Sequence, residues 1–397
     1  MIVGEELELL SEESMKAWAE STLEKLKVKM RIAVAMAAEE HFIPYSTKDG
    51  KWSPTGIGWW TNGFWGALMW QMFLLTKENA YRDAAVRAEE MMDAVLKEPE
   101  KLHHDVGFMW LIQSGVRYAL EGDPDSLSRA LRCADILAAR FNPNGFIRAW
   151  NGDDRIGTGI IDTMMNLSLL YWASRITKDP RYRLTAERHA DTALKYFVRP
   201  DGTCNHIVRF NPVTGEYIDN PGGQGYESGS SWSRGQAWGL YGFTLSYRMT
   251  GKKEYLEAAK RIANAFITAC QPEWVPYCDF RAPKEPKIYD NAAGAIAACG
   301  LLEMIRHLPE LQREPYRLAA SQLLLAMDKK CADWSDKTPA ILQMCTGAYH
   351  DKPSRHITMV YADYYFVEAV SRLLGGKMLF WGPDLKEDMT SYGSDAL

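Results

Sequence analysis

The sequence lacks an excess of positive charge, an uninterrupted apolar run of membrane-spanning length, and a basic leader with an apolar core. Among its 397 residues, 46 Lys and Arg stand against 51 Asp and Glu, a net charge of -5. This balance excludes a strongly basic nucleic-acid surface, and the interrupted apolar runs exclude a membrane span. The acidic start MIVGEELELLSEES does not resemble a secretion signal. We therefore expect a cytoplasmic protein with no nucleic-acid or membrane partner.

Cofactor-binding motifs are also missing. The chain has no P-loop, no Rossmann glycine pattern, no GxSxG nucleophile turn and no zinc signature. The seven cysteines are odd in number, form no CxxC pair, and in several cases fall in apolar helical runs. This usage is typical of buried, reduced thiols. We predict no metal and no organic cofactor.

Two kinds of helical segment alternate along the chain. The first kind is apolar almost all the way round and follows a polar or glycine-rich lead, at residues 60–76, 105–120, 159–177, 232–250, 290–308 and 359–374. The second kind is amphipathic and follows each of the first five, and four of its members open with a tyrosine (Tyr81, Tyr182, Tyr255 and Tyr316). With an amphipathic opener at residues 15–38, the chain has about twelve helices, six of each kind.

This alternation predicts an all-α fold, an (α/α)6 toroid with an inner ring of apolar helices and an outer ring of amphipathic ones. An open α-solenoid is the competing architecture, but six pairs is the number that closes a ring. The inner helices then begin at the same end, so their polar leads converge on one mouth. No linker divides the chain, and we predict one domain over residues 1–397.

Three loops are long enough to suggest function, at residues 44–57, 199–231 and 332–354. The second loop is rich in glycine and asparagine, and a short hairpin is expected across Thr214–Gly215.

One carboxylate, Asp162, lies at the start of the apolar run GTGIIDTMMNLSLLYW, with Asn166 one turn further along the same face. An unpaired charge is costly to bury, so this carboxyl is paired, protonated, or exposed to a polar cavity. A carboxyl facing a polar cavity would be a candidate catalytic acid. The alternative is a helix-capping aspartate that satisfies the amides of the first turn.

A second carboxylate, Asp105, follows two histidines in HHDVGFM at the start of another inner helix. Metal binding by His103 and His104 is one interpretation, but sequence neighbours on a helix point to different faces. A His/Asp pair that adjusts proton affinity is favoured instead, with a capping Asp as the other alternative. Two carboxylates at the same position of the repeat are expected to face one pocket, as acid/base chemistry on a sugar requires.

A third motif, SWSRGQAWGLY, places Arg234, Trp238 and Tyr241 on one helix face. A buried Arg beside aromatic rings suits a substrate that carries a carboxylate on a ring. The alternative is that Arg234 pairs with one of the protein's own aspartates. Trp60 and Trp65 in WWTNGFWGALMW offer stacking surfaces at the mouth, with core packing as the equal alternative.

In this order and spacing, HHDVGFM, GIIDTMMNLSLLYWA and SWSRGQAWGLYGF resemble the unsaturated glucuronyl hydrolases of glycoside hydrolase family 88. The WWTNGFWGALMW lead and the six-pair repeat fit as well, and the resemblance covers residues 52–374. It implies an enzyme acting on oligosaccharides left by polysaccharide lyases, whose non-reducing end is a 4,5-unsaturated uronic acid. Such enzymes hydrate the C4=C5 vinyl ether, and the resulting hemiketal opens to release the sugar as a keto acid.

The resemblance also implies roles for individual residues. By motif position, Asp162 matches the family's general acid/base, which protonates C4 and activates the water, and Asp105 matches the second essential carboxylate. The predicted substrate-binding set, with the less specific loop positions included, is Trp60, His104, His206, Gly222, Gln224, Arg234 and Trp238. No cofactor is implied, and the expected partner is a disaccharide-sized unsaturated oligosaccharide derived from a glycosaminoglycan.

Three other functions stay open. The sister family of unsaturated rhamnogalacturonyl hydrolases has the same chemistry but acts on pectin fragments. A non-catalytic sugar-binding toroid would retain the aromatic mouth but would not require both aspartates. A sugar epimerase would require histidines that face one another, for which His104 and His206 are the candidates.

Overall fold

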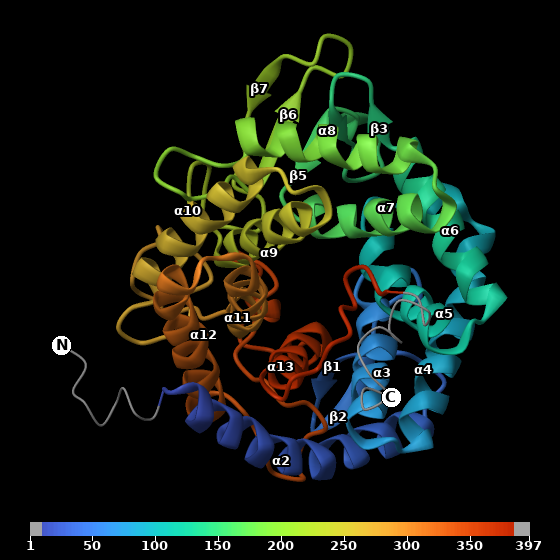
Figure 1. Cartoon of the computed structure of the whole chain (residues 1–397), viewed down its shortest axis with the longest axis vertical. Coiled ribbons are helices and arrows are strands. Elements are labelled where there is room, and N and C mark those ends of the chain that lie inside the picture. The colour runs from blue at the N-terminus through green and yellow to red at the C-terminus, as the bar shows by residue number, and fades with distance from the viewer. Residues whose placement is uncertain (1–9, 385–397) are drawn as a thin grey trace.

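A computed structural model describes residues 10–384 (Figure 1). Residues 1–9 and 385–397, which belong to the predicted single domain, lie outside the described residues, and so does most of the acidic start. That domain assignment stays a prediction.

Six inner helical segments form a ring, and each packs against the next. They are α3 (Asn62–Thr76), a π-helix η3 (Gly107–Gly115) continued by α5 (Val116–Glu121), α7 (Thr163–Thr177), α9 (Ser233–Thr250), α11 (Asn291–Met304) and α13 (Val360–Leu373). Because α13 also packs against α3, the ring is closed (Figure 1). The (α/α)6 toroid is therefore confirmed and the open solenoid is wrong.

The outer ring consists of the amphipathic helices. They are α2 (Glu12–Ala38), α4 (Asn79–Met91), α6 (Pro124–Ala139), α8 (Pro180–Tyr196), α10 (Lys253–Cys270) and α12 (Glu310–Lys330). The four tyrosines that open the outer helices are all buried, as expected of residues on the core-facing side. Short helical turns are η1 (Met92–Lys97), η2 (Pro99–Lys101), η4 (Asp153–Arg155), η5 (Ile305–His307) and η6 (Lys352–Ser354).

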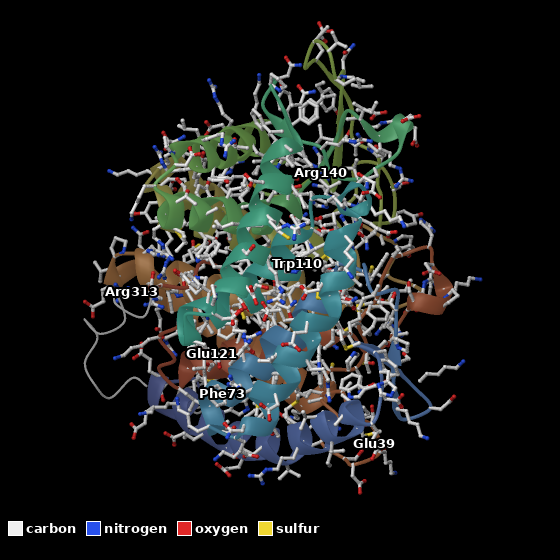
Figure 2. All side chains as sticks on the ribbon, turned by 90° about the vertical axis from the view of Figure 1, so that its right-hand side faces the viewer. Glu39, Phe73, Trp110, Glu121, Arg140 and Arg313 are labelled. Atoms are coloured by element: carbon white, nitrogen blue, oxygen red, sulfur yellow. The ribbon has the colours of Figure 1, made fainter. Side chains whose placement is uncertain are left out.

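One apolar cluster runs round the ring and takes side chains from both layers. In Figure 2, Trp110 lies in the middle of the molecule, whereas Glu39 and Arg313 lie at its edge. The seven cysteines are all buried and unpaired, which confirms the prediction of reduced thiols. Within residues 10–384, no helix is both long and apolar enough to cross a membrane.

Small antiparallel sheets occupy the loops. They pair β1 (Pro44–Lys48) with β2 (Lys51–Pro54), β3 (Phe141–Asn142) with β4 (Phe146–Ile147), and β5 (Thr158–Ile160) with β6 (Ile207–Phe210), which also pairs with β7 (Tyr217–Asp219). The β6–β7 hairpin confirms the turn expected across Thr214–Gly215.

Two helix starts differ from the prediction because of the local structure around them. The third inner helix begins at Thr163 and not at residue 159, because residues 158–160 pair with β6 as a strand. The second inner helix begins with a π-helix at Gly107, where an α-helix was expected from residue 105. A Cβ on Gly107 would lie 2.6 Å from Asn166 Oδ1, so the glycine permits this helix to approach α7 closely. Both aspartates therefore precede their helices and lie at the mouth.

Candidate active site

Asp162 occupies the residue before α7 and makes no capping hydrogen bond with its side chain. The side chain is buried, and its Oδ1 has no hydrogen-bond partner among the described residues. Burial, and after it the negative charge of Asp105, raises the pKa of Asp162 to about 8, although the charge of Arg234 opposes this. The capping alternative is therefore wrong, and at neutral pH Asp162 is a protonated acid.

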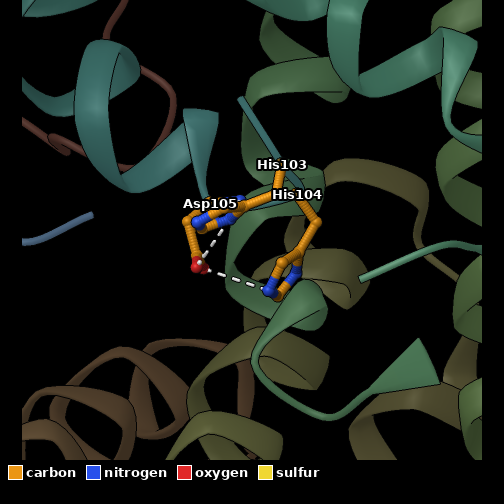
Figure 3. Close-up of side chains that lie close together, drawn as sticks. All are labelled: His103, His104 and Asp105. Atoms are coloured by element: carbon orange, nitrogen blue, oxygen red, sulfur yellow. Dashed lines mark hydrogen bonds and ion pairs between the residues drawn. The ribbon is translucent and has the colours of Figure 1, made fainter. Parts of the chain in front are cut away.

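Asp105 has the opposite environment (Figure 3). His103 Nδ1 lies 3.2 Å from one carboxylate oxygen and His104 Nε2 lies 3.3 Å from the other. Burial alone would raise the pKa of Asp105, but the two imidazoles and a hydrogen bond from Asn166 lower it below its ordinary value. Two carboxylates at equivalent repeat positions therefore hold different charges, one neutral and one negative.

Asn166 connects the two carboxylate-bearing segments. Its amide nitrogen lies 3.3 Å from Asp105 Oδ1 and 3.3 Å from the carbonyl oxygen of Asp162, to both of which it donates. Its own Oδ1 accepts from the backbone N–H of Phe108 at 2.9 Å. The π-helix and α7 are thus joined at the mouth by one buried amide.

His104 is a buried, neutral imidazole. Burial lowers its pKa to about 4. Its Nδ1 shares a hydrogen bond of 2.8 Å with the Thr163 hydroxyl, and its Nε2 faces Asp105 Oδ1 at 3.3 Å with no hydrogen-bond partner among the described residues. The start of α7 thereby orients the imidazole on Asp105.

The His–His–Asp cluster, His103 with His104 and Asp105, has one ligand-type atom from each residue within 4.8 Å of the others. The expectation that the two histidines point apart is wrong, because they lie in a non-helical turn before η3 and both face Asp105 (Figure 3). The two imidazole nitrogens lie within ion-pair distance of the carboxylate, at 3.2 and 3.3 Å, and we assign no metal. The absence of a metal stays a prediction.

His206 lies beside Asp162 because of strand pairing. Ile160 of β5 pairs with Ile207 of β6, and the N–H of Ile161 donates to the His206 carbonyl at 3.0 Å. The ring is buried on Trp232, with centroids 4.2 Å apart, and burial lowers its pKa to about 3.

The tautomer of His206 is set by the glycine-rich loop. Its Nδ1 accepts from the backbone N–H of Gln224 at 3.1 Å, so the proton lies on Nε2, 3.7 Å from Asp162 Oδ1. A hydrogen-bond donor therefore points toward the acid. Neither of these two atoms has a hydrogen-bond partner among the described residues, as expected where a substrate or water binds.

Arg234 is buried and held by the protein itself. Its Nη1 donates to Asp290 Oδ2 at 2.5 Å and to the Thr346 carbonyl at 2.7 Å, while Nη2 donates to the Gly347 carbonyl at 2.7 Å. The guanidinium also lies over the Trp232 ring at 4.7 Å. The alternative of pairing with an internal aspartate is therefore what the structure shows, and recognition of a substrate carboxylate by Arg234 stays a prediction.

Gln224 and Gly222 shape the wall beside His206. Gln224 Nε2 donates to the same Gly347 carbonyl at 2.7 Å, and the Gln224 carbonyl accepts from the N–H of Tyr349 at 2.9 Å. Gly222 accepts from the N–H of Gly225, in a turn where a Cβ would lie 2.4 Å from the Glu227 backbone. The loop at residues 220–230 is thus joined to the one at 346–349.

The aromatic residues form a wall around Phe108. Trp60 is half-buried, 5.3 Å from Phe108 between ring centroids, and Trp238 is fully buried at 5.0 Å from it. The Nε1 of Trp238 has no partner within the described chain. Trp65, by contrast, packs on Trp52 inside the core, so for this residue the packing alternative holds.

Sequence reasoning missed Asp290, the counter-ion of Arg234. It occupies the residue before α11, just as Asp162 occupies the residue before α7. The same repeat position is the signal that could have found it. Tyr361, 5.1 Å from Trp60 and 5.7 Å from the Arg234 guanidinium, was missed because nothing in its local sequence marks it.

Comparison with known proteins agrees with this geometry. Residues 27–271 match Glycosyl Hydrolase Family 88. The unsaturated glucuronyl hydrolase of Bacillus sp. strain GL1 is 38% identical over 81% of this chain and 88% of its own length. The unsaturated chondroitin disaccharide hydrolase of Streptococcus pyogenes serotype M1 is 31% identical over 86% of this chain and 88% of its own.

A solved structure of a substituted form of the enzyme called UGL, with dGlcA-Glc-Rha-Glc, superimposes with a TM-score of 0.86. It is 33% identical in sequence and covers 90% of this chain and 98% of that one. The family match and the named relative show that the protein is a glycosidase. The chain belongs to glycoside hydrolase family 88.

Proposed function

We propose that this enzyme removes the 4,5-unsaturated uronic acid from the non-reducing end of lyase-generated, glycosaminoglycan-derived oligosaccharides. One observation carries the proposal: a neutral carboxyl, Asp162, with an unpaired oxygen lies at the mouth beside the ionised Asp105. The relatives named for unsaturated glucuronyl and chondroitin disaccharide substrates support the choice of substrate class.

The reaction begins with a proton transfer from Asp162 to C4 of the vinyl ether. The positive charge that develops at C5 is shared with the ring oxygen, and the negative charge of Asp105 stabilises it. Water adds to C5 and gives its proton to the Asp162 carboxylate, which restores the acid. The C5 hemiketal then opens to a ketone, and the C1 hemiacetal collapses to release the neighbouring sugar.

Other groups bind and orient the substrate in this proposal. The Nε2–H of His206 points toward Asp162 from one side, and Trp60 offers a ring face at the mouth. We also propose that Arg234 contacts the sugar carboxylate, since a planar guanidinium matches the geometry of a carboxylate. We also propose a cytoplasmic location and a single domain. The seven unpaired cysteines support the first, and the large apolar cluster that runs round the ring supports the second.

The test is to incubate the protein with unsaturated disaccharides from chondroitin, hyaluronan and heparin, and to follow the ultraviolet absorbance of the conjugated alkene. Decay on at least one of them is expected, and Asp162→Asn is the matched control that should show none. Decay on pectin-derived disaccharides alone would show that the enzyme acts on rhamnogalacturonyl substrates instead. Binding of these sugars without decay of any of them would show that the protein is a non-catalytic sugar-binding toroid.

A further inference from the structure

Three inner helices are preceded by an aspartate at the mouth, and each aspartate has a different partner. Asp105 is held by imidazoles, and Asp162 has an unpaired oxygen. Asp290 is fully buried, accepts from Arg234 Nη1 at 2.5 Å, and accepts from the Thr346 N–H at 3.3 Å with its other oxygen. The third carboxylate is therefore the counter-ion of the arginine.

Arg234 is connected to Asp162 through two rings. Its guanidinium lies over the Trp232 ring at 4.7 Å, that ring contacts His206 with centroids 4.2 Å apart, and His206 Nε2 lies 3.7 Å from Asp162 Oδ1. The charge of Arg234 lowers the pKa of Asp162, against burial and the charge of Asp105, which raise it. Arg234 is itself 1% exposed, so water screens its charge little. An unopposed guanidinium at this place would favour the ionised form of Asp162, and an ionised Asp162 cannot donate a proton to the substrate.

We propose that Asp290 is a positioning residue for the reaction: it anchors Arg234 and cancels its charge, so that the guanidinium does not take Asp162 as its counter-ion. The inference rests on the proposed function, because Asp290 is proposed to act through Asp162, which is the acid of that reaction. The anchor is geometric as well as electrostatic. With Nη1 on Asp290 and Thr346, and Nη2 on Gly347, the guanidinium plane is fixed from three sides.

Of the ionisable neighbours of this pair, all except Asp162 stay neutral near neutral pH. The groups that face Arg234 or Asp290 from the surrounding elements are Asp162, His206, Tyr45, Cys278, Cys345, His356 and Tyr361. Burial raises the pKa of both tyrosines and both cysteines and lowers that of both histidines, so all six are neutral at pH 7 to 9. Asp162 is therefore the group in this set that titrates in that range.

The test is the variant Asp290→Asn, which keeps the shape and an oxygen that accepts hydrogen bonds but removes the charge. We expect the alkaline limb of kcat/KM against pH to move toward acid by about one unit or more. The double variant Arg234→Met with Asp290→Asn removes both charges, and its limb should return to within about half a unit of the parent. A loss of activity that is equal at every pH, with no movement of the limb, would overturn the proposal.

Asp363→Asn is the matched control. Asp363 is equally buried and accepts from the N–H groups of Ile341 at 3.0 Å and Leu342 at 2.7 Å, but the charge that acts on it is that of Lys29 and not that of Arg234. Asparagine has one acceptor oxygen for these two N–H groups, so the melting temperature should fall, and the alkaline limb should stay unmoved. Movement of the limb by the same amount in this variant would show a general effect of structural damage and refute the role of Asp290.

A second measurement needs no turnover. Carbon-13 NMR of aspartate carboxyls in the substrate-free enzyme follows Asp162 directly, with Asp162→Asn identifying its signal. The midpoint should fall in Asp290→Asn and recover in the double variant. An unchanged midpoint would refute the inference even in an active enzyme. A falling midpoint in a protein that acts on no unsaturated sugar would instead refute the proposed function alone.

Discussion

Replacing Asp162 by asparagine should abolish turnover and, at the same time, stabilise the fold at neutral pH. The carboxyl is held protonated by burial, with a pKa of about 8 against an ordinary value of 3.8. Asparagine is a neutral side chain of almost the same shape, so it occupies the site without the cost of retaining a proton. It has no acidic proton for C4, and a rate at least a thousand times lower is expected.

The size of the stabilisation follows from the shift in pKa. Since the folded-state pKa is raised, the folded protein keeps a proton that the unfolded chain releases. The contribution of the protonated carboxyl is complete below pH 3.8 and is lost as the pH rises toward 8. Each pH unit between the ordinary pKa and the working pH is worth about 1.4 kcal/mol in the free energy of unfolding. The stabilisation by Asp162→Asn therefore has an upper limit of about 4 kcal/mol at pH 7. For a chain of 397 residues, this corresponds to a rise in melting temperature of about 5 °C.

The assay compares melting temperatures of the parent and Asp162→Asn from pH 4 to pH 8. The difference should be close to zero at pH 4 and grow with pH. Asp105→Asn is the matched control with the opposite sign, since the pKa of Asp105 is lowered and its charge is held by imidazoles. That variant should melt at a lower temperature at pH 7. A gain for Asp162→Asn that does not depend on pH, or turnover within tenfold of the parent, would refute the assignment of the acid.

Three further results are expected. The alkaline limb of kcat/KM should have its midpoint near pH 8, because Asp162 must be protonated to donate; activity unchanged to pH 10 would argue against this acid. Gly223→Ala should lower kcat at least tenfold, since its Cβ would lie 2.2 Å from His206 Nδ1. Gly229 is also at positive φ but has no atom within 4 Å of its Cβ position, so Gly229→Ala should keep most of the activity in the same assay. Dialysis against a chelator should leave the activity intact. A loss of activity that one added metal restores would show that the His–His–Asp cluster is a metal site.

The sequence by itself determined the architecture, because the pattern that specifies it is local. A helix that is apolar all round must be covered, a helix with one apolar face must cover something, and six pairs of them close a ring. The same repeat located two of the three mouth carboxylates, Asp105 and Asp162, each at the end of a polar lead.

What the tertiary structure decided was the charge of each carboxylate, and with it the chemistry. The two aspartates are alike in the sequence, but Asp105 has two imidazoles and an amide around it, whereas Asp162 is buried with an unpaired oxygen that faces a neutral imidazole at 3.7 Å. The partners come from distant segments. Strand pairing places His206 beside Asp162, and Asp290, at the start of α11, pairs with Arg234 on the neighbouring helix α9. A pKa is set by the groups within a few ångströms in space, and the identity of those groups is fixed only when the ring closes.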